Sequence, residues 1–397
     1  MSTFRQAYLK DKERELPYFY CIGAAGCIGS VTYDRIAGFF DSPKAFYDAG
    51  TDKLRKLGIL TEGQLLRLET IKKDPETLRG FERALKAGIR TVPVESEEYP
   101  KNLKEIDDYA PVLFVKGKLP DEGTPCVSII GARECSGYGA AVAKRLGELF
   151  AEKGIAVVSG MARGIDSMAQ YAALSAGGYS VAFLGGGVDV IYPRESRHLY
   201  EILEKRGGIV SEFAPGTEPL RGYFARRNRL ISGMSHVVCV VEAKEKSGTM
   251  ITVNCALDQG REVFAVPGRI NDITSFGTNE LIRQGAGVIN DLNVFTDDLV
   301  KRYGGKRVAP AIKGSKNMDF LSPGERKIVE KIDDNSFTTE QMAACIGVPA
   351  YEILGLCITL SEKGMLYGMG AGRFRATGKG MEARDLLLLQ KQTEDEE

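Results

Sequence analysis

Residues 127–130 read VSII, residues 155–158 read IAVV and residues 236–241 read HVVCVV. These runs are apolar at almost every position, which is typical of strands in a parallel sheet that is covered by helices on both faces. Between them lie stretches with helical periodicity, such as residues 138–152, where apolar side chains recur on one side. This alternation of strands and helices predicts an α/β fold built on a doubly wound parallel sheet.

Six strands are expected in this sheet, at residues 127–130, 155–158, 180–184, 208–211, 236–241 and 262–266. The sheet is placed in a domain at residues 91–300, in which residues 91–125 form an extended connector with an apolar run at 112–115. The rest of the chain is divided into a helical domain at 1–90, a Gly- and Lys-rich linker at 301–318, a small domain at 319–380 and an acidic tail at 381–397. A chain of 397 residues is long enough for two or three domains.

The helical domain contains three glycines in the segment 23–29, which reads GAAGCIG and precedes an amphipathic stretch at 31–40. A glycine turn between two helices can present backbone N–H groups to a phosphate. The same residues also suit a tight turn between packed helices. Both interpretations are open from the sequence.

The small domain is predicted to be a winged helix-turn-helix. Its first helix is expected at residues 325–332, and Thr338 begins the second with a capping-box pattern. A third helix at 351–363 is followed by a β wing at 366–376. This third helix carries almost no arginine or lysine, so binding to duplex DNA and binding to another protein both remain open.

The chain has 53 basic and 53 acidic residues and a net charge of zero. A protein that coats nucleic acid non-specifically is usually basic overall, so an anion-binding site must come from local clustering. Eight cysteines occur without a CxxC pair, which argues against a zinc site. The charged N-terminus does not resemble a signal peptide, and no apolar stretch is long enough to cross a bilayer. We therefore expect a cytoplasmic protein that binds no membrane, metal or cofactor.

The ends of the predicted strands are rich in glycine, arginine and hydroxyl side chains. In an open α/β sheet, ligands bind beyond the carboxyl ends of the strands. Glycine lets a ligand approach the backbone closely, and helix N-termini offer free N–H groups to anions. Glycine and Ser/Thr caps are also common between a strand and a helix, but four such segments at one edge favour an anion-binding rim. These segments are 131–133, 159–164, 185–187 and 247–249.

The strongest local signal is the segment 221–229, which reads RGYFARRNR. Arginine side chains pair with phosphate oxygens and aromatic rings stack on unpaired bases, so single-strand binders combine both residue types. The alternative is a solvated helix start whose aromatic side chain belongs to the core. The binding interpretation is favoured because the cluster should join the glycine rim. A role limited to bracing neighbouring loops stays open for Asn228 and one arginine.

Sequence motifs of common enzyme classes are missing. The chain lacks the phosphate-binding loop GxxxxGK[ST], a GxGxxG fingerprint after the first strand, the HExxH motif and the GxSxG elbow. Its two histidines, His198 in an expected helix and His236 at the start of a strand, are expected to be structural. No catalytic residue is therefore expected, and the chain is predicted not to be an enzyme.

Eight stretches of the chain resemble the DprA/Smf family of bacterial DNA-processing proteins in sequence, order and spacing. They are SIIGARECSGYG (128–139), VVSGMARGIDSMAQYAAL (157–174), FLGGGVDVIYP (183–193), GGIVSEFAPGTEPL (207–220), YFARRNRLISGMS (223–235), VVEAKEKSGTMIT (240–252), REVFAVPG (261–268) and GTNELIRQGA (277–286). The resemblance implies a protein that binds and protects incoming single-stranded DNA and loads the RecA recombinase in natural transformation or recombination. It also implies an extended Rossmann-like domain that forms a homodimer, an N-terminal SAM-like domain and a C-terminal winged helix.

Carried over by position, the resemblance implies a phosphate pocket in which Phe224 stacks on a base. Together with the strand-end analysis, it leads to these candidate DNA-binding residues: Gly131, Arg133, Gly160, Arg163, Arg221, Phe224, Arg227, Asn228, Ser247, Gly248 and Thr249. Two positions depart from the family pattern. Gln170 stands where the family often has histidine, and Ala225 replaces the usual proline after the phenylalanine, which would loosen that loop.

The main competing hypothesis is a nucleoside-monophosphate hydrolase of the lysine-decarboxylase-like group, which has a similar sheet and a PGGxGTxxE loop. The comparable segment here, 244–252, reads KEKSGTMIT and keeps only the Gly-Thr pair. A pure interaction scaffold would leave the arginine cluster without a role. Single-stranded DNA binding is therefore the preferred prediction.

Overall fold

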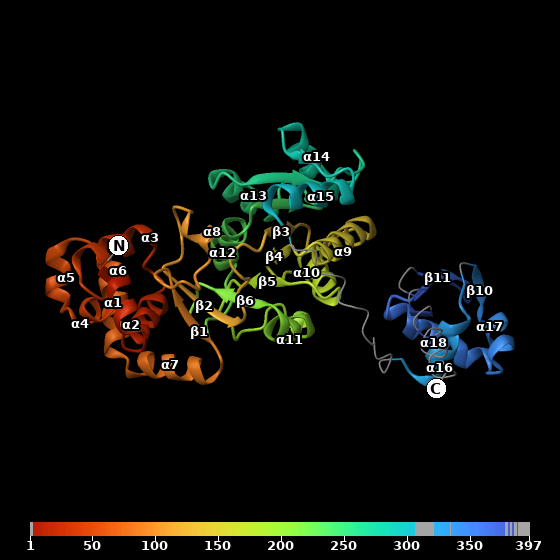
Figure 1. Cartoon of the computed structure of the whole chain (residues 1–397), viewed down its shortest axis with the longest axis horizontal. Helices are drawn as coiled ribbons and strands as arrows, with labels where there is room; N and C mark the ends of the chain where they lie inside the picture. The colour runs from red at the N-terminus through yellow and green to blue at the C-terminus, as the bar shows by residue number, and fades with distance from the viewer. Residues whose placement is uncertain are drawn as a thin grey trace. The chain divides into compact units, whose positions relative to one another are not determined.

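The computed structural model describes residues 3–305, 321–333 and 335–377, together with residues 380, 381, 383, 384 and 387. The chain divides into two compact units, residues 1–310 and 311–397, and Figure 1 shows the elements of each. Most of the predicted linker, residues 306–318, and the end of the predicted acidic tail, residues 388–397, lie outside the described residues.

A nine-stranded sheet forms the centre of the first unit. Its strand order is β1-β2-β6-β5-β4-β3-β7-β8-β9. The strands from β3 to β9 are parallel to one another, while β1 and β2 pair antiparallel at one edge. The bounds are β1 Arg90–Pro93, β2 Val112–Gly117, β3 Cys126–Ile130, β4 Ala156–Ser159, β5 Ser180–Phe183, β6 Gly208–Ser211, β7 Val237–Val240, β8 Glu262–Ala265 and β9 Gly287–Val288.

The predicted parallel α/β sheet is confirmed, and each of the six predicted strands begins and ends within one residue of its expected position. The predicted connector at 91–125 is wrong, because β2 and most of β1 belong to the same sheet. These strands escape the sequence pattern for a physical reason. They pair antiparallel at the edge of the sheet, so they lack the crossover helix that marks a parallel strand in the sequence. In addition, β1 has only four residues and ends in a proline, which edge strands tolerate.

Helices cover both faces of the sheet (Figure 1). Successive side chains of a strand point to opposite faces. Val127 and Ile129 of β3 therefore pack in one core with α9, α10 and α15, whereas Val238 and Val240 of β7 pack in a second core with α12 and α13. The bounds are α8 Lys101–Lys104, α9 Gly137–Glu152, α10 Ile165–Ser175, α11 Arg197–Arg206, α12 Arg221–Met234, α13 Thr249–Asp258, α14 Phe276–Arg283 and α15 Leu292–Tyr303.

Seven helices precede the sheet and share a core with its β1–β2 edge, where the ring of Phe114 packs against Tyr20. The glycine segment 23–29 is not a turn throughout, because α2 continues to Ala25 and Gly26 forms its left-handed C-cap. Gly23 lies inside the helix, where an added Cβ would be 2.9 Å from the Phe114 ring. Phosphate binding by this segment stays a prediction. The bounds are α1 Thr3–Lys10, α2 Lys12–Ala25, α3 Ser30–Phe39, α4 Pro43–Asp48, α5 Thr51–Leu57, α6 Glu62–Lys73 and α7 Pro75–Lys86.

The described part of the second unit includes helices α16, α17 and α18 and a three-stranded sheet in the order β10-β12-β11. The predicted capping box is confirmed, since Thr338 and Gln341 bond to each other's backbone at the start of α17. The identity of this unit as a winged helix stays a prediction. The bounds are α16 Pro323–Lys331, β10 Ser336–Thr338, α17 Thr339–Ile346, α18 Ala350–Glu362, β11 Leu366–Gly370 and β12 Arg373–Ala376.

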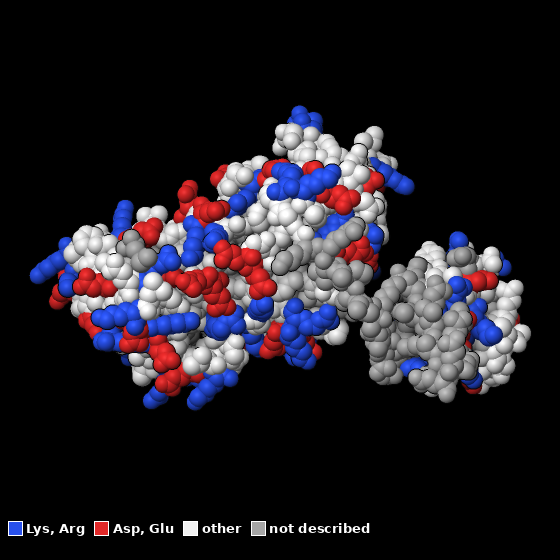
Figure 2. Space-filling model, viewed as in Figure 1, with Lys and Arg blue, Asp and Glu red and all other residues white. Residues whose placement is uncertain are grey.

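Charged side chains of both signs alternate across the face of the first unit shown in Figure 2, in keeping with the net charge of zero. Within the described ranges, no single helix has the length and apolar character to cross a membrane, although Thr339–Ile346 and Ala350–Ser361 meet those criteria together as a pair bent by 109°.

Candidate nucleic-acid interface

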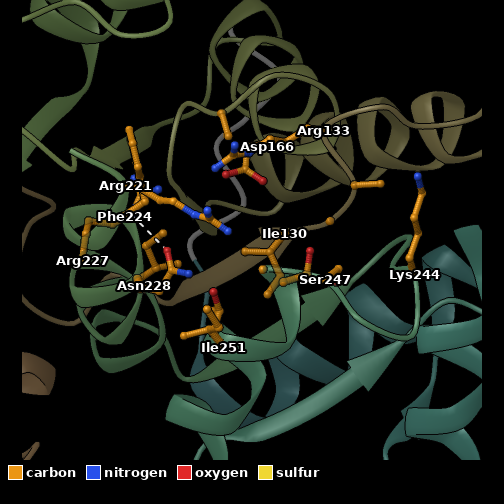
Figure 3. Close-up of a pocket in the computed structure, with 18 of the residues that line it drawn as sticks. Ile130, Arg133, Asp166, Arg221, Phe224, Arg227, Asn228, Lys244, Ser247 and Ile251 are labelled. Atoms are coloured by element: carbon orange, nitrogen blue, oxygen red, sulfur yellow. Dashed lines mark hydrogen bonds between the residues drawn. The ribbon is translucent and has the colours of Figure 1, made fainter. Parts of the chain in front are cut away.

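A cleft opens where the order of the sheet reverses. From β3 the chain runs through β4, β5 and β6 on one side and then returns to β7 on the other side. Connections that leave neighbouring strands in opposite directions create a crevice at the carboxyl ends of these strands, which is the usual ligand site of such sheets. The cleft has a volume of about 1150 Å³ and is lined by residues from the segments 130–134, 219–231 and 244–252, together with Ala162, Asp166 and Tyr192 (Figure 3).

The loop after β3 is held in place by Glu242, which is buried. The backbone N–H of Ser136 donates to Glu242 Oε2 at 2.8 Å, and the N–H of Ala132 donates to the Glu242 carbonyl oxygen at 2.8 Å. Gly131 is required here because an added Cβ would lie 2.9 Å from that carbonyl oxygen. Arg133 extends from this fixed loop into solvent, and it forms no ion pair with any described residue.

One face of α12 lines the cleft. Arg221, Phe224 and Asn228 are spaced three and four residues apart, so they lie on the same side of the helix. Arg221 is exposed and has no ion-pair partner among the residues described. The half-buried Phe224 ring packs on the ring of Tyr192, with the centroids 5.3 Å apart, and the guanidinium of Arg133 lies 5.8 Å from the Phe224 centroid.

Arg227 lines the base of the cleft and is almost completely buried. Its Nη1 donates to the carbonyl oxygens of Gly160, at 3.0 Å, and Phe183, while its Nε donates to Asn228 at 3.2 Å. Burial lowers the pKa of Arg227 to about 10, and the nearby carboxylate of Asp166 opposes that shift. Arg227 therefore ties together the carboxyl ends of β4 and β5 and holds Asn228 in place.

Two glycine segments of the predicted rim make room for these side chains. An added Cβ on Gly160 would lie 2.6 Å from the Arg227 guanidinium, and one on Gly185 would lie 2.8 Å from the Phe224 ring. The glycines thus permit close packing behind the cleft surface. Residues 185–187 do not line the cleft, and their part in an anion-binding rim stays a prediction.

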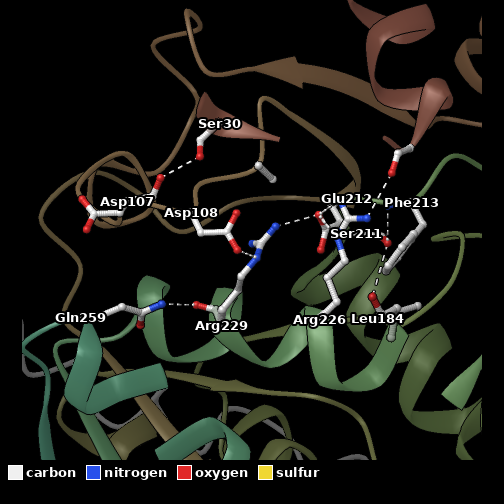
Figure 4. A network of polar contacts seen from close by, with 12 residues as sticks. Ser30, Asp107, Asp108, Leu184, Ser211, Glu212, Phe213, Arg226, Arg229 and Gln259 are labelled. Carbon is white, nitrogen blue, oxygen red and sulfur yellow. Dashed lines mark hydrogen bonds and ion pairs between the residues drawn. The ribbon is translucent and has the colours of Figure 1, made fainter. Parts of the chain in front are cut away.

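The other two arginines of the segment 221–229 do not line the cleft and belong to a separate polar network (Figure 4). Arg226 and Arg229 both pair with the buried carboxylate of Glu212, at 2.8 and 2.7 Å. Arg229 also pairs with Asp108 at 2.9 Å, and Arg226 donates to the carbonyl oxygen of Gly26 at 3.1 Å. Burial raises the pKa of Glu212, while the two guanidinium groups oppose that shift. This cluster joins α12 to the N-terminal helices. The positive charges of its two arginines are balanced by the carboxylates of Glu212 and Asp108.

The turn after β7 completes the cleft. Lys244 and Lys246 are exposed, and neither forms an ion pair with a described residue. Ser247 follows them, and its Oγ is buried without a hydrogen-bond partner in the described part of the chain. Gly248 and Thr249 begin α13, whose first turn has no side-chain cap. The N–H groups of Met250 and Ile251 donate to the carbonyl oxygens of Ser247 and Gly248, at 3.1 and 3.2 Å, so the positive charge of the two lysines is what makes this end of the cleft favourable for an anion.

The structure brings most of the candidate residues to one cleft, lined by Gly131, Arg133, Arg221, Phe224, Arg227, Asn228, Ser247, Gly248 and Thr249. Two candidates are elsewhere. Gly160 lies behind Arg227, and Arg163 pairs with Glu195 outside the cleft lining.

Sequence reasoning missed several cleft residues, among them Tyr192, Lys244 and Lys246. The lysines could have been found from their position directly before the predicted turn at 247–249. Tyr192 gives no such signal, because it reaches the cleft from a long loop after β5. Gln170, at one of the departures from the family pattern, is buried and hydrogen-bonded to the N–H of Met161 at 3.0 Å, away from the cleft.

Comparisons with known proteins agree on one family. The sequence profile of the DNA recombination-mediator protein A family matches residues 90–300. The protein Smf of Escherichia coli is 36% identical over 292 residues, which cover 72% of this chain and 76% of Smf. The DNA processing protein DprA of Bacillus subtilis is 42% identical over 217 residues, covering 54% of this chain and 73% of that protein. The crystal structure of DNA processing protein A from Streptococcus pneumoniae superposes with a TM-score of 0.62 at 30% identity and covers 72% of this chain and 98% of that one.

Proposed function

Because the chain belongs to the DNA recombination-mediator protein A family, we propose that it is a DNA-processing protein whose cleft binds single-stranded DNA. The observation that carries this proposal is the grouping of unpaired cations around aromatic rings in one cleft. Arg133 and Arg221 stand beside Phe224, and Lys244 and Lys246 stand at the other end. Each cation is free to meet a phosphate, because none is engaged in an ion pair with a described residue.

The rings favour a single strand over a duplex. Aromatic side chains stack on bases whose faces are open, and binders of single strands combine such rings with a basic groove. In a duplex the base faces are already stacked, so the phosphates alone could reach the cleft. The expected ligand is therefore a short segment of unpaired DNA bound without strict sequence preference.

Titration of labelled oligonucleotides by fluorescence anisotropy tests the proposal. The chain is expected to bind a single-stranded oligonucleotide more tightly than a duplex of the same length. Arg133→Ala should weaken binding to all sequences alike and should flatten the slope of log affinity against log salt by about 0.7. Arg145→Ala is a matched control, because Arg145 is an exposed arginine of α9 that pairs with Glu148 away from the cleft. Equal binding of both DNA forms, or unchanged binding by Arg133→Ala, would contradict the proposal.

We also propose that binding is not accompanied by turnover, in contrast to the hydrolase alternative. The observation behind this proposal is that the carboxylate of Glu242, which follows β7, is already engaged. It accepts hydrogen bonds from the backbone N–H and the hydroxyl of Ser136 and so holds the loop after β3. Incubation of the repurified protein with nucleoside monophosphates or DNA is expected to yield no products by chromatography. Turnover that disappears in Thr249→Ala would favour the hydrolase.

Finally, we propose that the protein protects incoming DNA, loads the RecA recombinase and forms a homodimer through the sheet domain. The far edge of the sheet supports the dimer. Val288 of the edge strand β9 is exposed, as are Ile270 and Ile273 between β8 and α14 and Phe276 at the start of α14. Sedimentation of the wild type and of Ile273→Asp should distinguish a dimer from a monomer. Recombinase assembly on single strands coated with a single-strand binding protein should be faster when the wild type is added.

A further inference from the structure

We propose that Tyr192 is a second base-stacking residue and forms a two-ring platform with Phe224. This inference rests on the proposed binding of single-stranded DNA and names a residue of that same site. Tyr192 lines the cleft, and its ring packs against Phe224 with an interplanar angle of 38°. A base that stacks on Phe224 would therefore have Tyr192 beside it, within reach of the neighbouring base of the strand.

The two rings differ in how much of their surface a ligand can reach. Phe224 is half-buried, with the Arg133 guanidinium over its ring and the Gly185 backbone at its edge. Tyr192 is 48% exposed, and Phe224 supplies its only ring contact in the described part of the chain. A large exposed ring in a cleft with four free cations therefore offers a base a second stacking surface beside Phe224.

The loop that carries Tyr192 is fixed, which makes its ring a preformed surface. The N–H of Gly187 donates to the carbonyl oxygen of Thr217 at 2.8 Å, and Asp189 Oδ1 accepts from the N–H of Gly216 at 2.8 Å. These bonds anchor the segment before Tyr192 to the segment that leads into α12. The ring is therefore positioned without the entropy loss that ordering a mobile side chain would require.

The hydroxyl group of Tyr192 is not what holds the ring in place. No hydrogen bond joins it to any residue that the structure describes, in keeping with the exposure of this side chain. The function of the side chain should then depend on its ring. Tyr192→Phe is expected to bind DNA as the wild type does, whereas Tyr192→Ala is expected to lose affinity.

A single tryptophan tests the stacking directly. The chain contains no tryptophan, so Tyr192→Trp installs one fluorescent reporter at the proposed contact. Titration with a single-stranded oligothymidylate is expected to quench this fluorescence, because a stacked base lies against the indole. An oligonucleotide of equal length with abasic sites keeps the phosphates and should quench much less. Equal quenching by both, or by neither, would overturn the inference.

Affinity measurements separate this inference from the proposed function. Tyr192→Ala should weaken binding of the oligothymidylate about fivefold or more and should hardly change binding of the abasic strand. Tyr171→Ala is the matched control, since Tyr171 is 45% exposed on α10 but lies outside the cleft lining. If the wild type binds single strands and Tyr192→Ala binds them equally well, the inference fails and the proposed function stands. If the wild type binds no single-stranded DNA, both fail.

Discussion

The two sides of helix α12 use the same residue type for opposite purposes. On the cleft side, Arg221 is exposed and unpaired within the described residues, next to the half-buried ring of Phe224. On the other side, Arg226 and Arg229 share the buried carboxylate of Glu212. Both sides are rich in arginine, but only the cleft side presents positive charge to a ligand. The function of an arginine here depends on the acceptors that surround it.

Arg227 lies between these two sides and follows neither pattern. It lines the cleft, yet its Nη1 donates to the carbonyl oxygens of Gly160 and Phe183. A buried guanidinium bonded to carbonyl groups keeps its positive charge, which the nearby carboxylate of Asp166 offsets in part. It therefore positions the end of the sheet and adds to the positive potential of the cleft floor.

The largest expected effect is on stability and concerns Glu212. Glu212→Ala removes a carboxylate that is 3% exposed and leaves the buried guanidinium of Arg229 without its inner partner. Breaking a buried ion pair typically costs about 3–5 kcal/mol, so the unfolding free energy in urea should fall by that order. Glu280→Ala, which disrupts the exposed pair with Arg283, should cost less than about 1 kcal/mol. DNA affinity per folded molecule should stay unchanged in Glu212→Ala, and a selective loss of affinity would contradict the division of α12 into two sides.

A smaller effect, on affinity, is expected for Phe224. Stacking contributes about 1–3 kcal/mol per base, so Phe224→Ala should weaken single-strand binding by roughly 5- to 150-fold. Phe224→Tyr should be almost silent because the ring remains, and neither variant should change the salt dependence. The ring is only half-buried, so its removal should destabilise the fold less than the about 3–5 kcal/mol of a fully buried phenylalanine. A large fall in melting temperature with unchanged affinity per folded molecule would assign Phe224 to the core.

The two sides of α12 should also differ in their salt dependence. Arg221→Ala is expected to flatten the slope of log affinity against log salt by about 0.7, the value for one phosphate contact on a single strand. Arg226→Ala removes the same charge from the other side, where the guanidinium is already paired with Glu212. Its slope should match that of the wild type in the same anisotropy titration. Equal flattening in both variants would mean that overall charge, and not contact in the cleft, determines binding.

The strands of the parallel sheet could be predicted because each is short and most are apolar on both faces, and several are followed by a glycine-containing turn. The same turns indicated the carboxyl edge, and the rule that ligands bind there placed Arg133 and Thr249 in one cleft. Such inferences need only local pattern and topology. They do not depend on the contacts between side chains that lie far apart in the sequence.

The sequence could not predict which arginines line the cleft and which pair with carboxylates, because this depends on partner residues from other elements. Arg226 and Arg229 are neutralised by Glu212, from the loop after β6, and Arg229 also by Asp108. Tyr192 reaches the cleft from another loop and carries no periodic signal. The packing role of Gly185 could not be predicted for a related reason, because a glycine that admits a ligand and one that admits a phenylalanine ring look alike in sequence.

The smallest effect is expected for Arg163. This residue was predicted to bind DNA because it follows the second predicted strand. Its side chain is 63% exposed and pairs with the equally exposed Glu195, outside the cleft lining. Arg163→Ala should therefore change the unfolding free energy by less than about 1 kcal/mol and the affinity by less than about twofold. Because Arg163→Ala and Arg221→Ala each delete one exposed guanidinium, measuring both salt slopes separates contact from general attraction. General attraction would flatten both slopes, whereas phosphate contact in the cleft flattens only that of Arg221→Ala. If Arg163→Ala flattens the slope as much while Arg226→Ala leaves it unchanged, general attraction is ruled out, and the binding surface would have to be extended beyond the cleft to Arg163.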